Sequence, residues 1–344
     1  MSSYTPCPPS QTRLLDVAER AGVSVITVSR ALRTPAKVAP ETRARIEAAV
    51  ASLGYVPNLV AGALASARTR TVGILVPTVS SSIFATTING LTDALESEGY
   101  SIVLAQSGYE AAREVAALAA LLGRRPEGIV MVGSPMTDAA RIMLEAAQDR
   151  GTMVVETWDL PERPIGSVVG FDNRAVGNAV AARFAAAGHQ RLAFVGGDDD
   201  RASARFHGFA ETAARLGQAP PLRIQLPAPS AMADAVAAYN AAHGPESLSR
   251  ADAIFAATDV HAFGLLSAAL RHGRRVPEDT ALVGLGDLEM ARFSIPSLTT
   301  VRIDGARMGQ AAASLILEGV RRPSHDYAPK RIDLGFELIV RESG

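Results

Sequence analysis

The chain has 344 residues and a mass of 35.9 kDa, which is long enough for two to three domains. Hydrophobic residues make up 48% and charged residues 20%, so a large buried core is possible and global disorder is excluded. The net charge of −1 argues against a general binder of polyanions. However, residues 1–70 carry nine basic and four acidic side chains, a net charge of +5, whereas the remainder carries −6. This asymmetry directs the search for a nucleic-acid site to the N-terminus.

The sequence also excludes several kinds of site. The only cysteine, Cys7, lies in a Pro- and Ser-rich segment, so we expect neither a disulfide framework nor a thiolate metal site. Residues 1–11 lack the features of a signal peptide, and no apolar run approaches the ~18 residues that a membrane span needs. We therefore expect a soluble, cytoplasmic protein with a disordered leader at 1–11 and with no metal or cofactor.

Residues 12–57 have a helical pattern and predict a small three-helix core. Gly22 can adopt the positive φ that a tight turn between the first two helices requires. Ser24 can cap the second helix by accepting a hydrogen bond from a free backbone N–H. The third helix would begin near Pro40. The apolar positions expected to pack inward are Leu14, Val17, Ala18, Ala21, Val28, Ala31, Leu32, Ile46, Ala49, Val50 and Leu53.

The outward face of the second helix is a candidate DNA reader. Four side chains would project from it: Val25, Ile26, Ser29 and Arg30. A helix-turn-helix presents its second helix to the major groove in this way, and apolar side chains there can contact thymine methyl groups. The alternative is a helical hairpin that covers an enzyme, with arginines that are merely solvated, and spacing alone does not decide between the two.

From residue 71 onward, short apolar runs alternate with amphipathic stretches, which indicates parallel βαβ units. About ten strands are more than a single sheet usually contains, so we expect an α/β core of two doubly wound, parallel-sheet lobes. The N-lobe would comprise about 71–170 and 302–332, and the C-lobe about 171–301 and 333–344. Predicted strands lie at 71–77, 100–106, 126–133, 151–157, 191–197, 251–259 and 279–287, and predicted helices include 88–98, 110–122, 138–150, 175–187 and 261–272.

Several motifs extend beyond these patterns: Asp16–Ala18, Ala21–Ser24, Thr27–Arg30, Gly54–Tyr55, Pro57–Asn58 and, at the end of the chain, Arg341–Ser343. Together they resemble the LacI/GalR family of bacterial transcription regulators. Within that family the chain is most similar to the gluconate-operon repressor branch, on the motifs ALRTPAKV, SGY (Ser107–Tyr109), VGFDN (Val169–Asn173) and IDLGF (Ile332–Phe336). The resemblance implies a homodimeric, ligand-controlled repressor whose core is like that of periplasmic sugar-binding proteins.

The resemblance also implies roles for single residues in binding operator DNA. Val25, Ile26 and Arg30 match positions that read base edges. Residues 58–70 match the hinge and linker, in which Leu64 would be the wedge inserted between base pairs in the minor groove. The other matched positions, which contact phosphates, frame the helices or belong to the hinge helix, are Ser24, Thr27, Ser29, Lys37, Thr42, Asn58 and Ala61. One departure is Ala39, where the family often has a capping Ser or Thr.

Ligands of such α/β sheets lie at the carboxyl ends of the strands, so the residues that follow the predicted strands are candidates for an effector site. They are Ile83, Phe84, Trp158, Arg205, Thr258, Asp259 and Asp287. Arg205 matches the family's effector-contacting arginine and could hold a carboxylate through two parallel bonds; the alternative is an ion pair with one of Asp198–Asp200. Asp259 could instead cap a helix. At the position where many members carry an aspartate, this chain has Gly286, with Asp287 adjacent.

No catalytic motif is present: the sequence lacks a phosphate-binding P-loop, a nucleophile elbow and a zinc-binding helix, and its six histidines are scattered. We therefore expect no catalytic residues. The leading hypothesis is a DNA-binding repressor controlled by a sugar acid such as gluconate, with neutral or phosphorylated sugars still open. The alternative is a sugar-binding or sugar-modifying metabolic protein with an incidental basic head.

Overall fold

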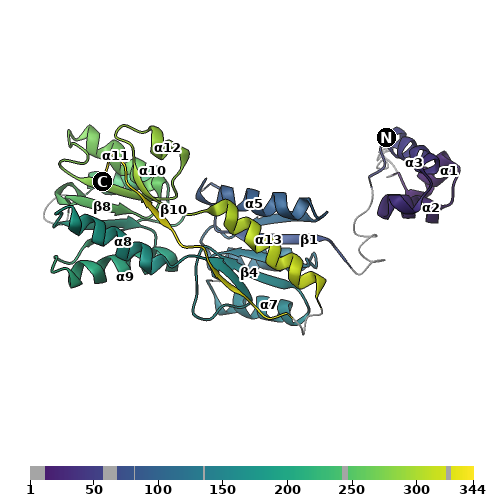
Figure 1. The fold of residues 1–344 in the computed structure, drawn as a ribbon, viewed down its shortest axis with the longest axis horizontal. Coiled ribbons are helices and arrows are strands. Elements are labelled where there is room, and N and C mark those ends of the chain that lie inside the picture. The colour runs from purple at the N-terminus through teal and green to yellow at the C-terminus, as the bar shows by residue number, and fades with distance from the viewer. Residues whose placement is uncertain (1–11, 57–67, 81, 135, 242–246, 323–326) are drawn as a thin grey trace, which may run out of the picture. The chain divides into compact units, whose positions relative to one another are not determined.

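The computed structural model describes residues 12–56, 68–80, 82–134, 136–241, 247–322 and 327–344. Its chain forms two compact units, one that ends at Thr69 and one from Arg70 to Gly344 (Figure 1). The predicted leader at 1–11 and the predicted hinge residues Asn58, Ala61 and Leu64 lie outside the described residues.

The first unit is a three-helix bundle with the predicted turn. Its elements are α1 (Leu14–Ala21), α2 (Val25–Arg33), the short 3-10 helix η1 (Pro35–Lys37) and α3 (Pro40–Leu53). Gly22 ends α1 with a φ of 62°, and the Ser24 hydroxyl accepts a hydrogen bond from the Thr27 N–H at 3.2 Å. Ala39 precedes α3 without a side-chain cap, as the sequence indicated.

The small core of this unit matches the predicted apolar set except at one position. Val17, Ala18, Ala21, Val28, Ala31, Ile46 and Ala49 are buried, and Leu14, Val50 and Leu53 pack against them. The prediction for Leu32 is wrong, because its side chain is exposed. The buried stripe of α2 runs through Val28 and Ala31, and the next residue lies about 100° further round the helix.

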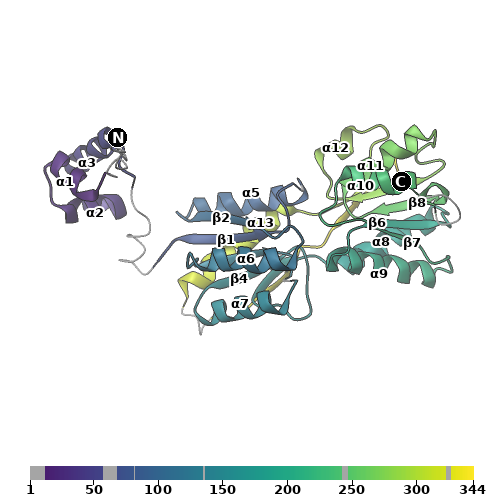
Figure 2. The ribbon, with the colours of Figure 1, turned by 180° about the vertical axis from the view of Figure 1, so that it is seen from behind.

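The second unit contains two six-stranded sheets. The first has the order β11-β5-β4-β3-β1-β2, and we call it, with its helices, the N-lobe. Helices α5 (Ala85–Glu96) and α13 (Gly305–Arg321) lie on one face of this sheet, and α6 (Ala111–Leu122) and α7 (Asp138–Asp149) lie on the other (Figures 1 and 2). The strands are β1 (Thr71–Val76), β2 (Ser101–Gln106), β3 (Gly128–Val132), β4 (Met153–Thr157), β5 (Ser167–Gly170) and β11 (Arg331–Asp333), and η2 (Ser82–Phe84) follows β1.

The second sheet, which with its helices forms the C-lobe, has the order β12-β10-β9-β8-β6-β7, and the β10–β12 pair is antiparallel. Helices α8 (Asn173–Ala186) and α9 (Asp200–Arg215) cover one face, and α10 (Met232–Ala241) and α11 (Asp259–Arg271) cover the other (Figure 2). The remaining elements are β6 (Leu192–Gly196), β7 (Leu222–Gln225), η3 (Leu248–Arg250), β8 (Ala253–Ala256), β9 (Ala281–Leu285), α12 (Glu289–Phe293), β10 (Thr299–Arg302) and β12 (Glu337–Ile339).

These two lobes confirm the predicted fold class. Central strands such as β3, β6 and β9 are buried along their whole length, as expected for parallel strands covered by helices on both faces. The described chain passes between the lobes after β5, after β10 and after β11. None of the described helices is long and apolar enough to cross a membrane.

Helices α8 and α9 approach closely through two glycines. A Cβ at Gly177 in α8 would collide with the carbonyl oxygen of Arg205, and a Cβ at Gly208 in α9 would collide with the carbonyl oxygen of Arg174. The absence of side chains at these two positions therefore fixes the position of the turn of α9 that carries Arg205.

Gly177→Ala should lower the free energy of unfolding by roughly 1–3 kcal/mol, because the two helix backbones must separate, and this cost should exceed the gain in helix propensity. Urea unfolding would measure it. Ala182→Ser, at an exposed position of the same helix, should change stability by less than about 0.5 kcal/mol. Equal stability of Gly177→Ala and the wild type would show that the close approach is not required.

Candidate functional site

A cavity of about 70 Å³ lies between the lobes, at the carboxyl ends of strands from both sheets. Residues that follow β1, β2 and β4 line it from the N-lobe, and residues that follow β6, β7 and β8 line it from the C-lobe. A second cavity of about 380 Å³ adjoins it and shares Tyr109, Asp198, Asp199, Arg201 and Ala228 with its lining. The strand ends therefore converge on one cleft, the usual place for a ligand in sheets of this kind.

Five of the seven predicted effector residues line the smaller cavity, namely Ile83, Phe84, Trp158, Arg205 and Thr258. The other two, Asp259 and Asp287, do not belong to its lining.

Arg205 is a buried cation without a carboxylate partner. Its side chain lies in the second turn of α9, and the residue is only 6% exposed. Its Nη1 donates a hydrogen bond to Oδ1 of Asn173, and its Nε has no partner. None of the described carboxylates forms an ion pair with it; Asp199, the acid of the neighbouring turn, pairs instead with Arg201, at 3.4 Å between Oδ1 and Nε. Burial lowers the pKa of Arg205 to about 10, which shows that this environment disfavours an unpaired charge.

Asn173 is oriented so that its carbonyl oxygen faces Arg205. Its Nδ2 donates to the backbone oxygen of Trp158 at 3.1 Å and to Oδ1 of Asp159 at 3.0 Å. Since both amide protons are used on these acceptors, Oδ1 is the atom left to accept from the guanidinium. A neutral amide satisfies one N–H of Arg205, and the nearest carboxylates, Asp199 and Asp159, attract its charge without forming an ion pair with it.

Trp158 and Phe84 form an apolar wall of the cavity. Trp158 has a φ of 69°, and its Nε1 donates to Oγ1 of Thr87 at 3.1 Å. Its ring meets that of Phe84 at 5.2 Å between centroids and 89° between planes, and it meets Phe171 at 5.9 Å. These contacts hold the indole in the N-lobe, where an edge-to-face arrangement is favourable.

His261 and Thr258 contribute polar groups from the start of α11. Thr258 caps this helix by accepting a hydrogen bond from the His261 N–H at 3.3 Å, so the cap comes from Thr258 rather than from Asp259. The imidazole Nε2 of His261 lies 2.9 Å from Oγ of Ser230. Burial lowers the pKa of His261 to about 4, so the ring is neutral at pH 7. His261 therefore adds no second positive charge beside Arg205.

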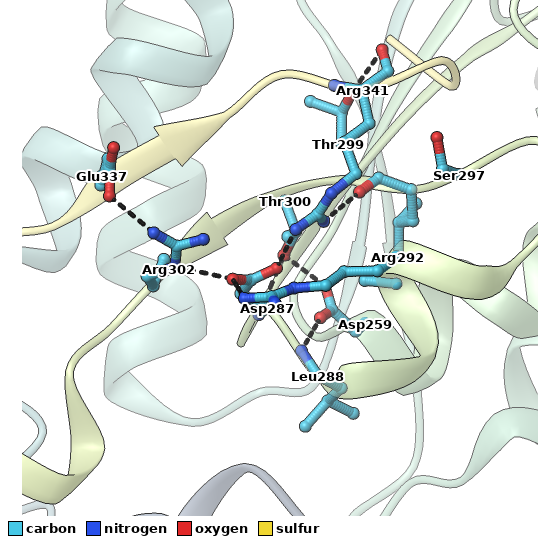
Figure 3. Close-up of polar contacts among 12 residues, drawn as sticks. Asp259, Asp287, Leu288, Arg292, Ser297, Thr299, Thr300, Arg302, Glu337 and Arg341 are labelled. Atoms are coloured by element: carbon cyan, nitrogen blue, oxygen red, sulfur yellow. Dashed lines mark hydrogen bonds and ion pairs between the residues drawn. The ribbon is translucent and has the colours of Figure 1, made fainter.

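Protein partners occupy the carboxylates of Asp259 and Asp287 (Figure 3). Asp259 is fully buried and accepts hydrogen bonds from Oγ1 of Thr300 at 2.5 Å and from the Leu288 N–H at 2.8 Å. Asp287 pairs with Nε of Arg302 at 2.7 Å and with Nη2 of Arg341 at 2.5 Å. These contacts connect the loop after β9 to β10, near the point where the chain passes from β10 into the N-lobe. The effector role predicted for the two aspartates receives no support from this geometry.

The candidate DNA-reading face of α2 projects into solvent. Ile26 is 70% exposed, and Val25 and Arg30 are exposed beside it. No described acidic side chain pairs with Arg30, whose guanidinium is therefore available to a base or a phosphate. Of the other predicted positions, Ser24 and Lys37 are exposed, and Thr27, Ser29 and Thr42 are half-buried. Arg45, counted above as part of the basic head, donates instead to the backbone oxygen of Ala21 at 2.8 Å and fixes the turn after α1.

Comparison with known proteins agrees with both parts of this description. Residues 13–58 match the family of bacterial regulatory proteins, lacI family, and residues 181–344 match a periplasmic binding protein-like domain. The HTH-type transcriptional regulator GntR of Pseudomonas aeruginosa PAO1 is 34% identical over 332 residues, which cover 96% of this chain and 95% of that protein. The chain belongs to the lacI family. It is a DNA-binding transcriptional regulator controlled by a small-molecule effector, and not an enzyme.

Solved structures of lacI-family proteins share the fold over nearly the whole chain. A regulator from Silicibacter pomeroyi has a TM-score of 0.85 and 32% identity, and the match covers 96% of this chain and 99% of that one. The lac repressor dimer bound to operator and the anti-inducer ONPF has a TM-score of 0.78 and 25% identity, with 97% and 99% covered.

The residues of this lacI-family cleft that were not among the predicted site residues include Tyr109, Asn173, Arg201 and His261. Tyr109 and Asn173 lie within the motifs SGY and VGFDN, which had served only to place the chain within its family. Arg201 lies one helical turn before Arg205, so the i,i+4 spacing could have assigned both arginines to one face of α9. His261 follows the candidate Thr258 by three residues, and the same helical periodicity could have found it.

The buried Asp259 makes stability depend on pH. Burial raises its pKa from 3.8 to about 6, so its contribution is fully present below pH 3.8 and is lost as the pH rises through 6. Asp259→Asn has no charge to bury, so its stability relative to wild type should rise by about 2 kcal/mol between pH 4 and pH 7. Urea unfolding of both proteins across this range measures the difference. A difference that does not vary with pH would contradict the raised pKa.

Proposed function

We propose that this regulator is a repressor whose effector is a sugar acid of the gluconate class, held by its carboxylate on Arg205. The observation that carries the proposal is the buried guanidinium of Arg205, which contacts no described carboxylate. A carboxylate in the cavity would supply the missing negative charge and accept hydrogen bonds from the guanidinium, including its free Nε. A neutral sugar would leave the charge unpaired in a desolvated place, which is unfavourable.

The charges around the cavity favour a monoanion. Arg201 pairs with Asp199 and Asp198 pairs with Arg223, so Arg205 is the cation of this lining that contacts no described carboxylate. One ligand carboxylate would supply that contact, whereas the phosphate of a phosphorylated sugar would bring a second negative charge next to Asp199. The uncharged residues of the lining, such as Ser230, Thr258 and the neutral His261, are suited to the hydroxyl groups of a sugar acid.

Arg205→Ala should weaken the binding of gluconate by about 10²–10³-fold and should remove the effect of gluconate on operator binding, because the ligand carboxylate loses its buried partner. Operator affinity without ligand should not change. Calorimetric titration with gluconate, together with operator binding in its presence and absence, measures both effects.

The matched control is Arg215→Ala, an exposed arginine of the same helix, which should bind gluconate as the wild type does. Arg205→Lys should restore little, since an ammonium group lacks the planar fork that grips a carboxylate. Gluconate affinity in Arg205→Ala equal to that of the wild type would remove this residue from the site.

We propose that the exposed face of α2 contacts the bases of the operator. Val25, Ile26 and Arg30 would contact base edges, while Ser24, Thr27, Ser29, Lys37 and Thr42 would contact phosphates or frame the helices. The proposal divides the chain into a head at 12–57, a hinge at 58–70, with Asn58, Ala61 and Leu64 toward the minor groove, and an effector-binding and dimerisation domain at 71–344. A DNA-binding role implies a place in the cytoplasm.

A homodimer on a near-palindromic operator completes the proposal. Its support is the match to the lac repressor dimer and an apolar surface around the end of α12. There Phe293 is 74% and Ile295 is 88% exposed, and Met290 is exposed beside them. Such a cluster of large apolar side chains typically marks a protein contact.

Arg30→Ala should reduce discrimination between operator and scrambled DNA by at least tenfold, because a base-edge contact contributes about 1–3 kcal/mol in each half-site. Fluorescence anisotropy with both DNAs measures it. Lys37→Ala is the control: loss of a phosphate contact should weaken binding to both DNAs alike. If Arg30→Ala keeps the selectivity of the wild type, Arg30 does not read bases.

A further inference from the structure

Arg201 reaches from one lobe to the other. It belongs to the first turn of α9 in the C-lobe, but its guanidinium carbon lies 5.4 Å from the centre of the Phe84 ring, which belongs to the N-lobe. It also lies beside Gly133, which follows β3 of the N-lobe: a Cβ at Gly133 would be 3.5 Å from the guanidinium carbon. The planar cation is therefore stacked against N-lobe surface while its backbone remains in the C-lobe.

Arg201 forms its ion pair within its own lobe, whereas Arg205 forms none, and the side chain of Tyr109 in the N-lobe is a further hydrogen-bond partner of Arg201. Its Nε lies 3.4 Å from Oδ1 of Asp199, which also accepts the Ala202 N–H at 3.2 Å and so caps the start of α9. Burial alone would lower the pKa of Arg201, but the combined attraction of Asp199 and of Tyr109 and Asp159 in the N-lobe outweighs it and raises the pKa. Arg201 is thus a stable, oriented cation that needs no ligand to remain buried.

The position of Arg201 makes it sensitive to the distance between the lobes. It lines both the smaller and the larger cavity of the cleft. If the N-lobe moved away, the guanidinium and the ring face of Phe84 would both be exposed to water, and a cation over an aromatic face is worth most when it is desolvated. The contact therefore opposes the opening of the cleft.

We propose that Arg201 is an interlobe clasp, which holds the lobes in the arrangement seen here through its stacking on Phe84. In this account Arg201 is a positioning residue that sets how far the cleft opens, whereas Arg205 is the residue that meets the ligand. The clasp does not depend on the chemical class of the effector.

Distance measurements between two spin labels test the clasp in the full-length protein without any ligand. The spin labels are attached at Asp149→Cys in α7 of the N-lobe and at Ala214→Cys in α9 of the C-lobe, both exposed positions. The native cysteine is replaced (Cys7→Ser), and labelled chain is diluted with unlabelled chain so that only distances within one chain are measured. Arg201→Ala should broaden the distance distribution and shift it to longer values. Phe84→Leu should do the same, since leucine keeps apolar bulk but offers no π face, and the double variant should add little to either single change.

The chain supplies a matched control. Arg223 lies 4.8 Å from the centre of the Phe206 ring, but both residues belong to the C-lobe, so Arg223→Ala removes a similar contact without crossing the cleft. Its distance distribution should equal that of the wild type. The clasp is overturned if Arg201→Ala and Phe84→Leu leave the distribution unchanged, or if Arg223→Ala broadens it as much. Should Arg201→Ala fail to fold, Phe84→Leu carries the test alone, because it leaves both charges in place.

Discussion

A guanidinium that is removed from water must find a partner for its charge, and among the described side chains the hydrogen-bond partner of Arg205 is the amide oxygen of Asn173, with no carboxylate in contact. Both lobes hold this buried charge in place: the glycine contact between α8 and α9 of the C-lobe fixes the backbone of Arg205, and Trp158 and Asp159 of the N-lobe hold Asn173. A site that keeps a cation buried and unpaired is prepared for an anion before the anion arrives. That preparation is the physical basis for a carboxylate-bearing effector.

The two arginines of α9 have different roles in the cleft because only Arg201 has a carboxylate in contact. Asp199 compensates Arg201, which can then serve as a contact between the lobes, while Arg205 is left for the ligand. Since the cavity is formed by strand ends from both lobes, a ligand that neutralises Arg205 also contacts both lobes. An effector can change operator affinity only by preferring one arrangement of the lobes, and this placement allows such a preference.

The sequence predicted the architecture well where burial is continuous and less well where elements are short. Strands such as β3 and β9 are apolar throughout, and their pattern was sufficient; β7, β11 and β12, of three or four residues, carry too little pattern to be recognised. In the head, Leu32 has the right hydrophobicity but lies just beyond the face that α2 buries. At the site, adjacency to a strand end identified Arg205 and Thr258, but it could not show that the carboxylates of Asp259 and Asp287 turn toward Thr300, Arg302 and Arg341. Those partners come from distant parts of the chain, so only the folded structure places them.

The most direct test of the central claim is to compensate Arg205 from within the protein and to ask whether gluconate still binds. Asn173→Asp is nearly isosteric and places a carboxylate where the amide oxygen now accepts from Arg205; because it also loses the hydrogen bonds that Nδ2 donates to Trp158 and Asp159, its stability is measured beside its affinity. Calorimetric titration of gluconate into this variant should show affinity reduced by about tenfold or more, because the excess charge that recruits the ligand has been cancelled. Undiminished gluconate binding in a folded Asn173→Asp protein would contradict the account, since it would show that the uncompensated charge of Arg205 is not what the effector recognises.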